Sequence, residues 1–206
     1  MRKALSCVLM MTLLLSGCKA GGAGETPEEA ALAVRDAYQS LAGWSAAVDI
    51  TAEVGDKVFD FTLDAVWRRE GETVLTITAP ELLAGITARI AEGETVLEYD
   101  GAGLSLGLLD DSGVTAVSAV TALMGQIEKG YQARCAWAGE NGEFLQVTYR
   151  DPELAPSEGT EFLLTFERAS RALRSAEVSV AGETVLTAEF TNFTMEEQQD
   201  DTGDGA

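Results

Sequence analysis

Residues 57 to 67 alternate between apolar and polar side chains, and this pattern strongly constrains the fold. In KVFDFTLDAVW the odd positions from Phe59 to Trp67 are apolar, and positions 60, 62 and 64 hold aspartate or threonine. Successive side chains of a strand point to opposite faces. The segment is therefore predicted to be a strand with one apolar and one solvated face. The apolar face either closes a core or holds a ligand.

The same alternation recurs along most of the chain, with glycine, aspartate or glutamate in the short connections. Such tight connections are typical of antiparallel neighbours. In the first half we predict strands at 44–54, 57–67, 73–79 and 85–91, a fifth carrying Leu97 and Tyr99, and a sixth carrying Leu104 and Leu106. In the second half we predict strands at about 131–138, 143–150, 160–168, 173–181 and 184–193.

Two segments show helical periodicity instead. The first is predicted at about 27–42, where Thr26 caps, Pro27 occupies the first turn and Glu29 completes a capping box. The second, at about 114–129, repeats apolar residues at intervals of three and four and ends at Gly130. The predicted fold is mainly β with two helices (α+β). A strongly curved antiparallel sheet of about eleven strands would form an incomplete barrel covered by the helices.

The N-terminal segment has the features of an export signal. Arg2 and Lys3 precede an apolar stretch from Ala4 to Leu15 that is too short to span a bilayer comfortably. The following Leu-Ser-Gly-Cys resembles the bacterial lipobox, which implies that Cys18 is diacylated and becomes the first mature residue. The alternative is an ordinary cleaved signal with a chance cysteine.

These features divide the chain into four parts. We predict a lipoprotein signal peptide at 1–17, a flexible tether at 18–26, one domain at 27–193 and a disordered acidic tail at 194–206. The protein would be exported and anchored through Cys18 to the extracytoplasmic face of a bacterial membrane.

Charge and composition exclude several functions. The formal net charge of −20 disfavours nucleic acid as a partner. The chain contains no histidine, which excludes histidine-based catalysis and disfavours a zinc site. We therefore expect no enzymatic activity, no metal and no cofactor, and we expect a monomer. Cys135 is expected to be an inert, half-buried strand residue.

The order of one helix, six strands, a second helix and five strands resembles the bacterial lipoprotein-carrier family (LolA/LolB-like). The segment Ile77-Thr78-Ala79-Pro80-Glu81-Leu82-Leu83-Ala84-Gly85 adds to this resemblance. It implies a half-barrel that holds acyl chains and helices that cover it. One departure is the lipobox, because the soluble carrier of that family is not lipidated.

The candidate ligand-binding residues are the apolar side chains expected on the concave face, in the leucine loop and on the covering helix. They are Trp44, Val48, Ile50, Phe59, Phe61, Leu63, Trp67, Leu75, Ile77, Leu82, Leu83, Ile86, Ile90, Leu97, Tyr99, Leu104, Leu106, Val120, Leu123, Met124 and Ile127. Leu82 and Leu83 are interpreted either as rim residues that help acyl chains move or as a plug in the core.

Three functions stay open at this point. The first is a lipid or lipoprotein acyl-chain binder that carries or transfers its ligand. The second is an envelope sensor or regulator that acts through a membrane or lipoprotein partner. The third is a structural surface lipoprotein whose concave face is fully packed.

Overall fold

The computed structural model describes residues 24–198, except residues 55, 93 and 109–115. The signal peptide and Cys18 lie outside the described residues. The elements are α1 (Pro27–Gln39), β1 (Leu41–Val54), β2 (Lys57–Arg68), β3 (Thr73–Ala79), β4 (Thr87–Ala91), β5 (Glu94–Tyr99), β6 (Ala102–Leu108), α2 (Ala116–Lys129), β7 (Gln132–Ala138), β8 (Phe144–Arg150), β9 (Thr160–Glu167), β10 (Leu173–Val180) and β11 (Glu183–Glu197). The predicted order of helices and strands is confirmed.

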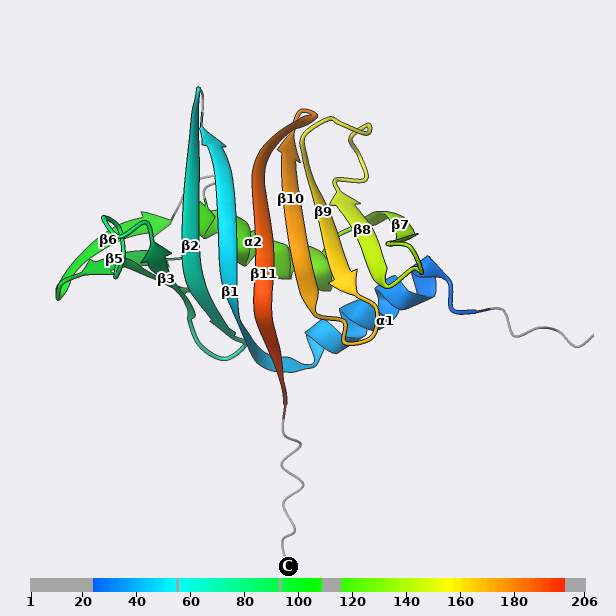
Figure 1. Ribbon diagram of the computed structural model, residues 1–206, viewed down its shortest axis with the longest axis horizontal. Helices are drawn as coiled ribbons and strands as arrows, with labels where there is room; N and C mark the ends of the chain where they lie inside the picture. Colours follow the sequence, from blue (N-terminus) through cyan, green and yellow to red (C-terminus); the bar gives the residue numbers. More distant parts are fainter. Residues whose placement is uncertain (1–23, 55, 93, 109–115, 199–206) are drawn as a thin grey trace, which may run out of the picture.

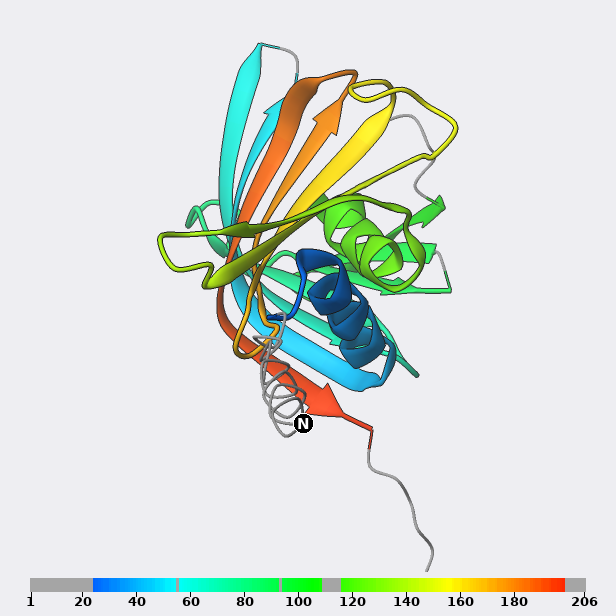
Figure 2. The same cartoon turned by 90° about the vertical axis from the view of Figure 1, so that its right-hand side faces the viewer.

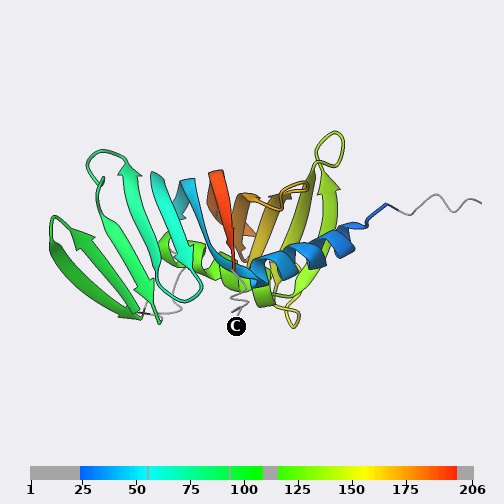
Figure 3. The same ribbon diagram turned by 90° about the horizontal axis from the view of Figure 1, so that it is seen from below.

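All the strands form one antiparallel sheet in the order β6-β5-β4-β3-β2-β1-β11-β10-β9-β8-β7 (Figure 1). Every neighbouring pair except β1 and β11 is consecutive in sequence, which is what the short connections predict. The strands fan out along a curved row when seen from below (Figure 3). Strands β6 and β7 are the two edges, so the sheet is open, as the predicted incomplete barrel requires.

Both helices lie on the same side of the sheet, which wraps around them (Figure 2). Helix α2 follows β6 at one edge and precedes β7 at the other, so it must cross the concave face. Helix α1 contacts α2, β7 and β8. Among the described residues, no helix has the length and apolar character needed to cross a membrane.

The core lies between the two helices and the concave face. It contains Tyr38 from α1, Trp44 from β1 and Ile127 from α2, together with inward-facing residues of β8 to β11. The Trp44 ring stacks on Phe193 at a centroid distance of 5.2 Å and meets Phe190 edge-on. The Trp44 indole N–H also donates to the Met124 sulfur at 2.9 Å, which ties α2 to β1.

Three boundaries around the β1–β11 pair differ from the prediction for one reason. Helix α1 ends at Gln39, and β1 begins at Leu41 instead of 44. Strand β11 continues to Glu197, beyond the predicted end at 193. The two extensions pair with each other, since Leu41 lies opposite Glu197 and Gly43 opposite Glu196. Neither extension shows clean alternation, so only the pairing reveals them.

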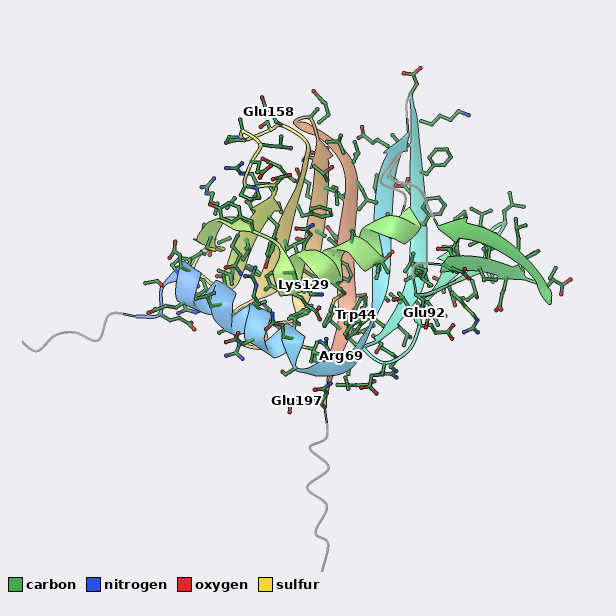
Figure 4. All side chains as sticks on the ribbon, turned by 180° about the vertical axis from the view of Figure 1, so that it is seen from behind. Trp44, Arg69, Glu92, Lys129, Glu158 and Glu197 are labelled. Atoms are coloured by element: carbon green, nitrogen blue, oxygen red, sulfur yellow. The ribbon has the colours of Figure 1, made fainter. Side chains whose placement is uncertain are left out.

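Arg69, just after β2, joins three elements at the end of α1 (Figure 4). Its guanidinium donates to the Leu41 carbonyl at 2.7 Å, to the Tyr38 carbonyl at 2.8 Å and to Glu128 of α2 at 2.9 Å. The neighbouring Arg68 forms only an exposed ion pair with Glu196. Arg69 therefore holds α1, β1 and α2 together.

Replacing Arg69 by alanine should lower the free energy of unfolding by about 1.5–3 kcal/mol, because part-buried acceptors lose a charged donor. The matched control is Arg68→Ala, which should change the unfolding midpoint little, since exposed ion pairs contribute little. Urea unfolding followed by circular dichroism measures both variants. Equal midpoints for the two variants would contradict the role of Arg69.

Candidate functional site

The strand register brings the predicted ligand-binding residues of different strands onto one face. Trp44 lies opposite Trp67, Val48 opposite Leu63, and Ile50 opposite Phe61. Across the next strands, Leu63 lies opposite Ile77, Leu75 opposite Ala88, Ala88 opposite Leu97, and Leu97 opposite Leu104. The apolar stripe therefore runs continuously from β1 to the edge strand β6.

The predicted residues differ widely in burial. The buried ones are Trp44, Val48, Ile50, Leu63, Leu75, Val120, Leu123, Met124 and Ile127. The half-buried ones are Phe61, Trp67, Ile77, Leu83, Ile86, Ile90 and Leu97. Phe59, Leu82, Tyr99 and Leu104 are exposed. The side chain of Leu106 lies outside the described residues. The part of the set near α2 and β1 thus belongs to the core, while the outer part is accessible.

Burial separates the two halves of the concave face. In the half made by β8 to β11, the inward-facing residues such as Val147, Leu164 and Val178 are fully buried. In the half made by strands β2 to β6, here called the β2–β6 arm, several large inward-facing side chains remain accessible. Apolar area left in water is costly, at about 25 cal/mol per Å². The accessible part of the arm is therefore the candidate ligand site.

The accessible residues lie at the same strand ends of the arm, spread from β2 to β6. This open end is where β2, β4 and β6 begin and where β3 and β5 finish. Phe59 is 40% exposed at the start of β2, Leu82 is 88% exposed after β3, Tyr99 is 55% exposed at the end of β5, and Leu104 is 62% exposed near the start of β6. The Phe59 and Phe61 rings stack at a centroid distance of 6.3 Å. The open end is thus an aromatic and aliphatic rim.

The opposite end of the arm is closed. There Thr73 of β3 and Thr95 of β5 are buried, and Thr73 lies opposite both Trp67 and Ile90. The Trp67 ring is covered by the Arg69 guanidinium, whose carbon lies 5.2 Å from the ring centroid. A ligand reaching the arm would therefore enter from the open end.

A hollow of about 360 Å³ marks the open end. Its lining consists of Thr87, Glu98, Tyr99 and Asp100 with Gly85, Gly101, Ala102 and Gly103. Asp100 and Gly101 both have positive φ angles, of 49° and 78°, which form the tight β5–β6 turn. Thr87, Glu98 and Gly103 lie opposite one another on the convex face, so this hollow lies at the β5–β6 end and outside the concave stripe.

A second hollow, of about 270 Å³, lies between α1 and the β9–β10 turn and is more polar. In its wall the Arg168 guanidinium sits 3.9 Å from the centroid of the Trp137 ring and 3.6 Å from Glu25. Glu167 accepts a hydrogen bond from Ser170 at 2.5 Å in the same wall. Arg168 pairs with Glu25, and Glu167 pairs with Arg174 at 3.7 Å, so this hollow is a weaker candidate than the arm.

The C-terminal end of α2 is held by hydrogen bonds that the sequence did not indicate. Arg35 of α1 donates to the carbonyls of Ile127 and Gly130, and Gln39 donates to the Glu128 carbonyl at 2.8 Å. These groups satisfy carbonyls that a helix end leaves unpaired. The partners are about ninety residues apart in sequence, so no local pattern could have predicted them.

The ionisable groups buried in the core are suited to structure. Burial raises the pKa of the Tyr38 phenol, and its oxygen accepts from the Leu173 amide at 3.0 Å while its hydroxyl donates to the Arg171 carbonyl. Burial also raises the pKa of Tyr149 to about 12. Both phenols therefore stay neutral at physiological pH. Within the described ranges, no group of three or more acidic, cysteine or histidine side chains could hold a metal ion.

Cys135 on β7 is a free thiol of intermediate burial. Burial and the charge of Glu28 raise its pKa, and Arg35 opposes them. Its reaction with Ellman's reagent at mildly alkaline pH should therefore be slower than that of free cysteine, because the thiolate is the nucleophile. Cys135→Ala supplies the background rate, and urea should remove the protection. A rate above that of free cysteine would identify a reactive thiol instead.

No family model and no curated protein sequence matches this chain. Solved structures of LolA-superfamily proteins and of lipoproteins match over most of its length. A putative outer membrane lipoprotein-sorting protein domain from Vibrio parahaemolyticus has a TM-score of 0.46 and 10% identity, covering 86% of this chain and 94% of that one. A LolA superfamily protein from Nitrosomonas europaea has a TM-score of 0.41 and 13% identity, covering 82% and 95%.

The lipoprotein LppX from Mycobacterium tuberculosis also matches, with a TM-score of 0.41 and 14% identity, covering 80% of this chain and 93% of that one. The family that the sequence resembles is thus among the structures similar to this chain. At these levels of identity the similarity concerns the fold alone.

Proposed function

We propose that this chain is a membrane-anchored extracytoplasmic lipoprotein that binds a lipid acyl chain on the concave face of the β2–β6 arm. The observation that carries the proposal is the contrast within one sheet. The half formed by β8 to β11 buries its inward-facing residues except Val180 at the end of β10, whereas the arm leaves Phe59, Tyr99 and Leu104 accessible on the same face.

The shape and chemistry of the arm fit an acyl chain. An acyl chain needs apolar contact along its length and no hydrogen-bond partner. The apolar stripe, which crosses the strands of the arm from β1 to β6, offers such contact. Polar side chains of β2 such as Asp60 and Thr62 point to the convex face, where they bond to Thr51 and Asp49. The concave stripe is therefore free of carboxylates along β2.

Lipid binding is tested with the full-length chain carrying Cys18→Ser, which removes the proposed anchor. Titration with N-phenyl-1-naphthylamine, an uncharged fluorescent probe of apolar sites, should give saturable binding that an acyl lipid displaces. Native mass spectrometry of the same protein should reveal a copurified lipid. Absence of both probe binding and bound lipid would favour the structural lipoprotein with a packed concave face.

The proposed anchor is tested separately. Acylation of Cys18 would hold the wild-type chain in the membrane, since two acyl chains suffice for stable anchoring. Cys18→Ser should therefore move the protein from the membrane fraction to the soluble fraction. Retention of the variant in the membrane after a carbonate wash would place the anchor elsewhere.

The same variant distinguishes a carrier from a sensor. A carrier should transfer a labelled acyl lipid to acceptor vesicles, whereas a sensor should bind a membrane protein in only one of its loaded and empty states. Lipid transfer without state-dependent partner capture supports the carrier.

A further inference from the structure

We propose that the lipid bound by the β2–β6 arm has a head group without net negative charge. This inference rests on the proposed function, because it concerns the selectivity of the same site. It follows from the charges that surround the open end, where a head group would remain when the acyl chain lies in the arm.

Carboxylates occur at each turn and strand end that forms the open end. They are Glu53 and Asp56 at the β1–β2 tip, Glu81 in the β3–β4 connection, and Asp100 just after β5. Glu81 directly precedes the exposed Leu82, and Asp100 directly follows the exposed Tyr99. The apolar rim and the acidic groups are therefore interleaved.

Few cations offset these carboxylates. Lys57 lies at the β1–β2 tip, on the far side of Phe59 from the β5–β6 turn. Arg89 of β4 donates to both Glu72 and Glu98, so its charge is already paired. Arg89 lies on the convex face, because the preceding residue Ala88 faces the concave stripe and successive side chains alternate. Its partners Glu72 and Glu98 are therefore on the convex face as well.

Long-range electrostatics then discriminate between head groups. The Debye length is about 30 Å at 0.01 M salt and about 8 Å at 0.15 M, so several rim carboxylates act together on a head group at low salt. A fatty-acid carboxylate or an anionic phosphate would be repelled, whereas an uncharged or cationic head group would not. The turn that carries Tyr99 and Asp100 is where this effect should be strongest.

The test uses the full-length Cys18→Ser chain and three amphiphiles with the same hydrocarbon length, each below its critical micelle concentration. Palmitate, monopalmitoylglycerol and hexadecyltrimethylammonium displace N-phenyl-1-naphthylamine in parallel titrations. At about 0.01 M salt we expect palmitate to bind about tenfold more weakly than the other two, and at about 0.15 M salt the gap should narrow.

Two double variants locate the effect. Glu81→Gln with Asp100→Asn should strengthen palmitate binding several-fold and leave monopalmitoylglycerol unchanged. The control is Glu92→Gln with Glu94→Gln, which removes the same charge from the β4–β5 turn at the closed end and should change neither affinity. Figure 4 shows Glu92 in that turn, away from the β5–β6 tip.

The outcomes separate this inference from the proposed function. If none of the three amphiphiles displaces the probe and the probe itself does not bind, the acyl-binding function fails and this inference fails with it. If all three bind with the same affinity at low salt, acyl binding stands and the charge selectivity is overturned. Equal effects of the two double variants on palmitate would also overturn it, because the rim would then have no special role.

Discussion

Replacing Trp44 by alanine should lower the free energy of unfolding by about 3–5 kcal/mol, the typical cost of deleting a buried aromatic side chain. The indole is almost fully buried between the sheet and α2, where it stacks on Phe193 and contacts Phe190. Its N–H donates to the sulfur of Met124, so the substitution also removes a link between β1 and α2. Equilibrium unfolding in urea, followed by tryptophan fluorescence and circular dichroism, measures the loss.

The matched control is Trp67→Ala, on the neighbouring strand directly opposite Trp44. Trp67 faces the same side of the sheet but is only half-buried, and one side of its ring is covered by Arg69. Its deletion should therefore cost clearly less than that of Trp44. Similar losses for the two variants would mean that the core extends evenly along the concave face, against the division described above.

The order and facing of the elements could be predicted from the sequence because they depend on local patterns. Alternation in 57–67 placed Phe61 and Leu63 on one face, and the register confirms that both face inward. Capping by Thr26 and Glu29 placed the start of α1, and both predicted hydrogen bonds are present. Each of these features is decided within a few residues.

Coverage of the concave face could not be predicted in the same way. Phe61 and Leu63 have the same facing and similar character, yet Leu63 is 4% exposed and Phe61 is only half-buried. The difference depends on which strands α2 crosses, and this path is fixed by contacts between residues far apart in the chain. Tyr38 illustrates the point. The helical periodicity of its segment indicated only that it lies on an apolar helix face, whereas its hydroxyl donates to the Arg171 carbonyl, 133 residues away.

The contrast between Leu63 and Phe61 gives the decisive test of whether the arm holds a ligand. Leu63→Ala should cost about 2–5 kcal/mol of unfolding free energy, because it opens a cavity within the packed part of the face. Phe61→Ala should cost less, since its ring lies near the open end beside the exposed Phe59 and has fewer neighbours to lose. Urea unfolding of the Cys18→Ser chain with each substitution measures both values.

Lipid binding should respond in the opposite order. Phe61 belongs to the rim that an entering acyl chain would contact, so Phe61→Ala should weaken binding of N-phenyl-1-naphthylamine and of monopalmitoylglycerol several-fold. Leu63→Ala removes a side chain that is already packed against the protein. It should therefore weaken probe binding less than Phe61→Ala does, when binding is measured under conditions in which the variant stays folded. If Phe61→Ala is as destabilising as Leu63→Ala and leaves probe binding intact, the open end is a continuation of the core. The acyl chain would then have no place in the arm.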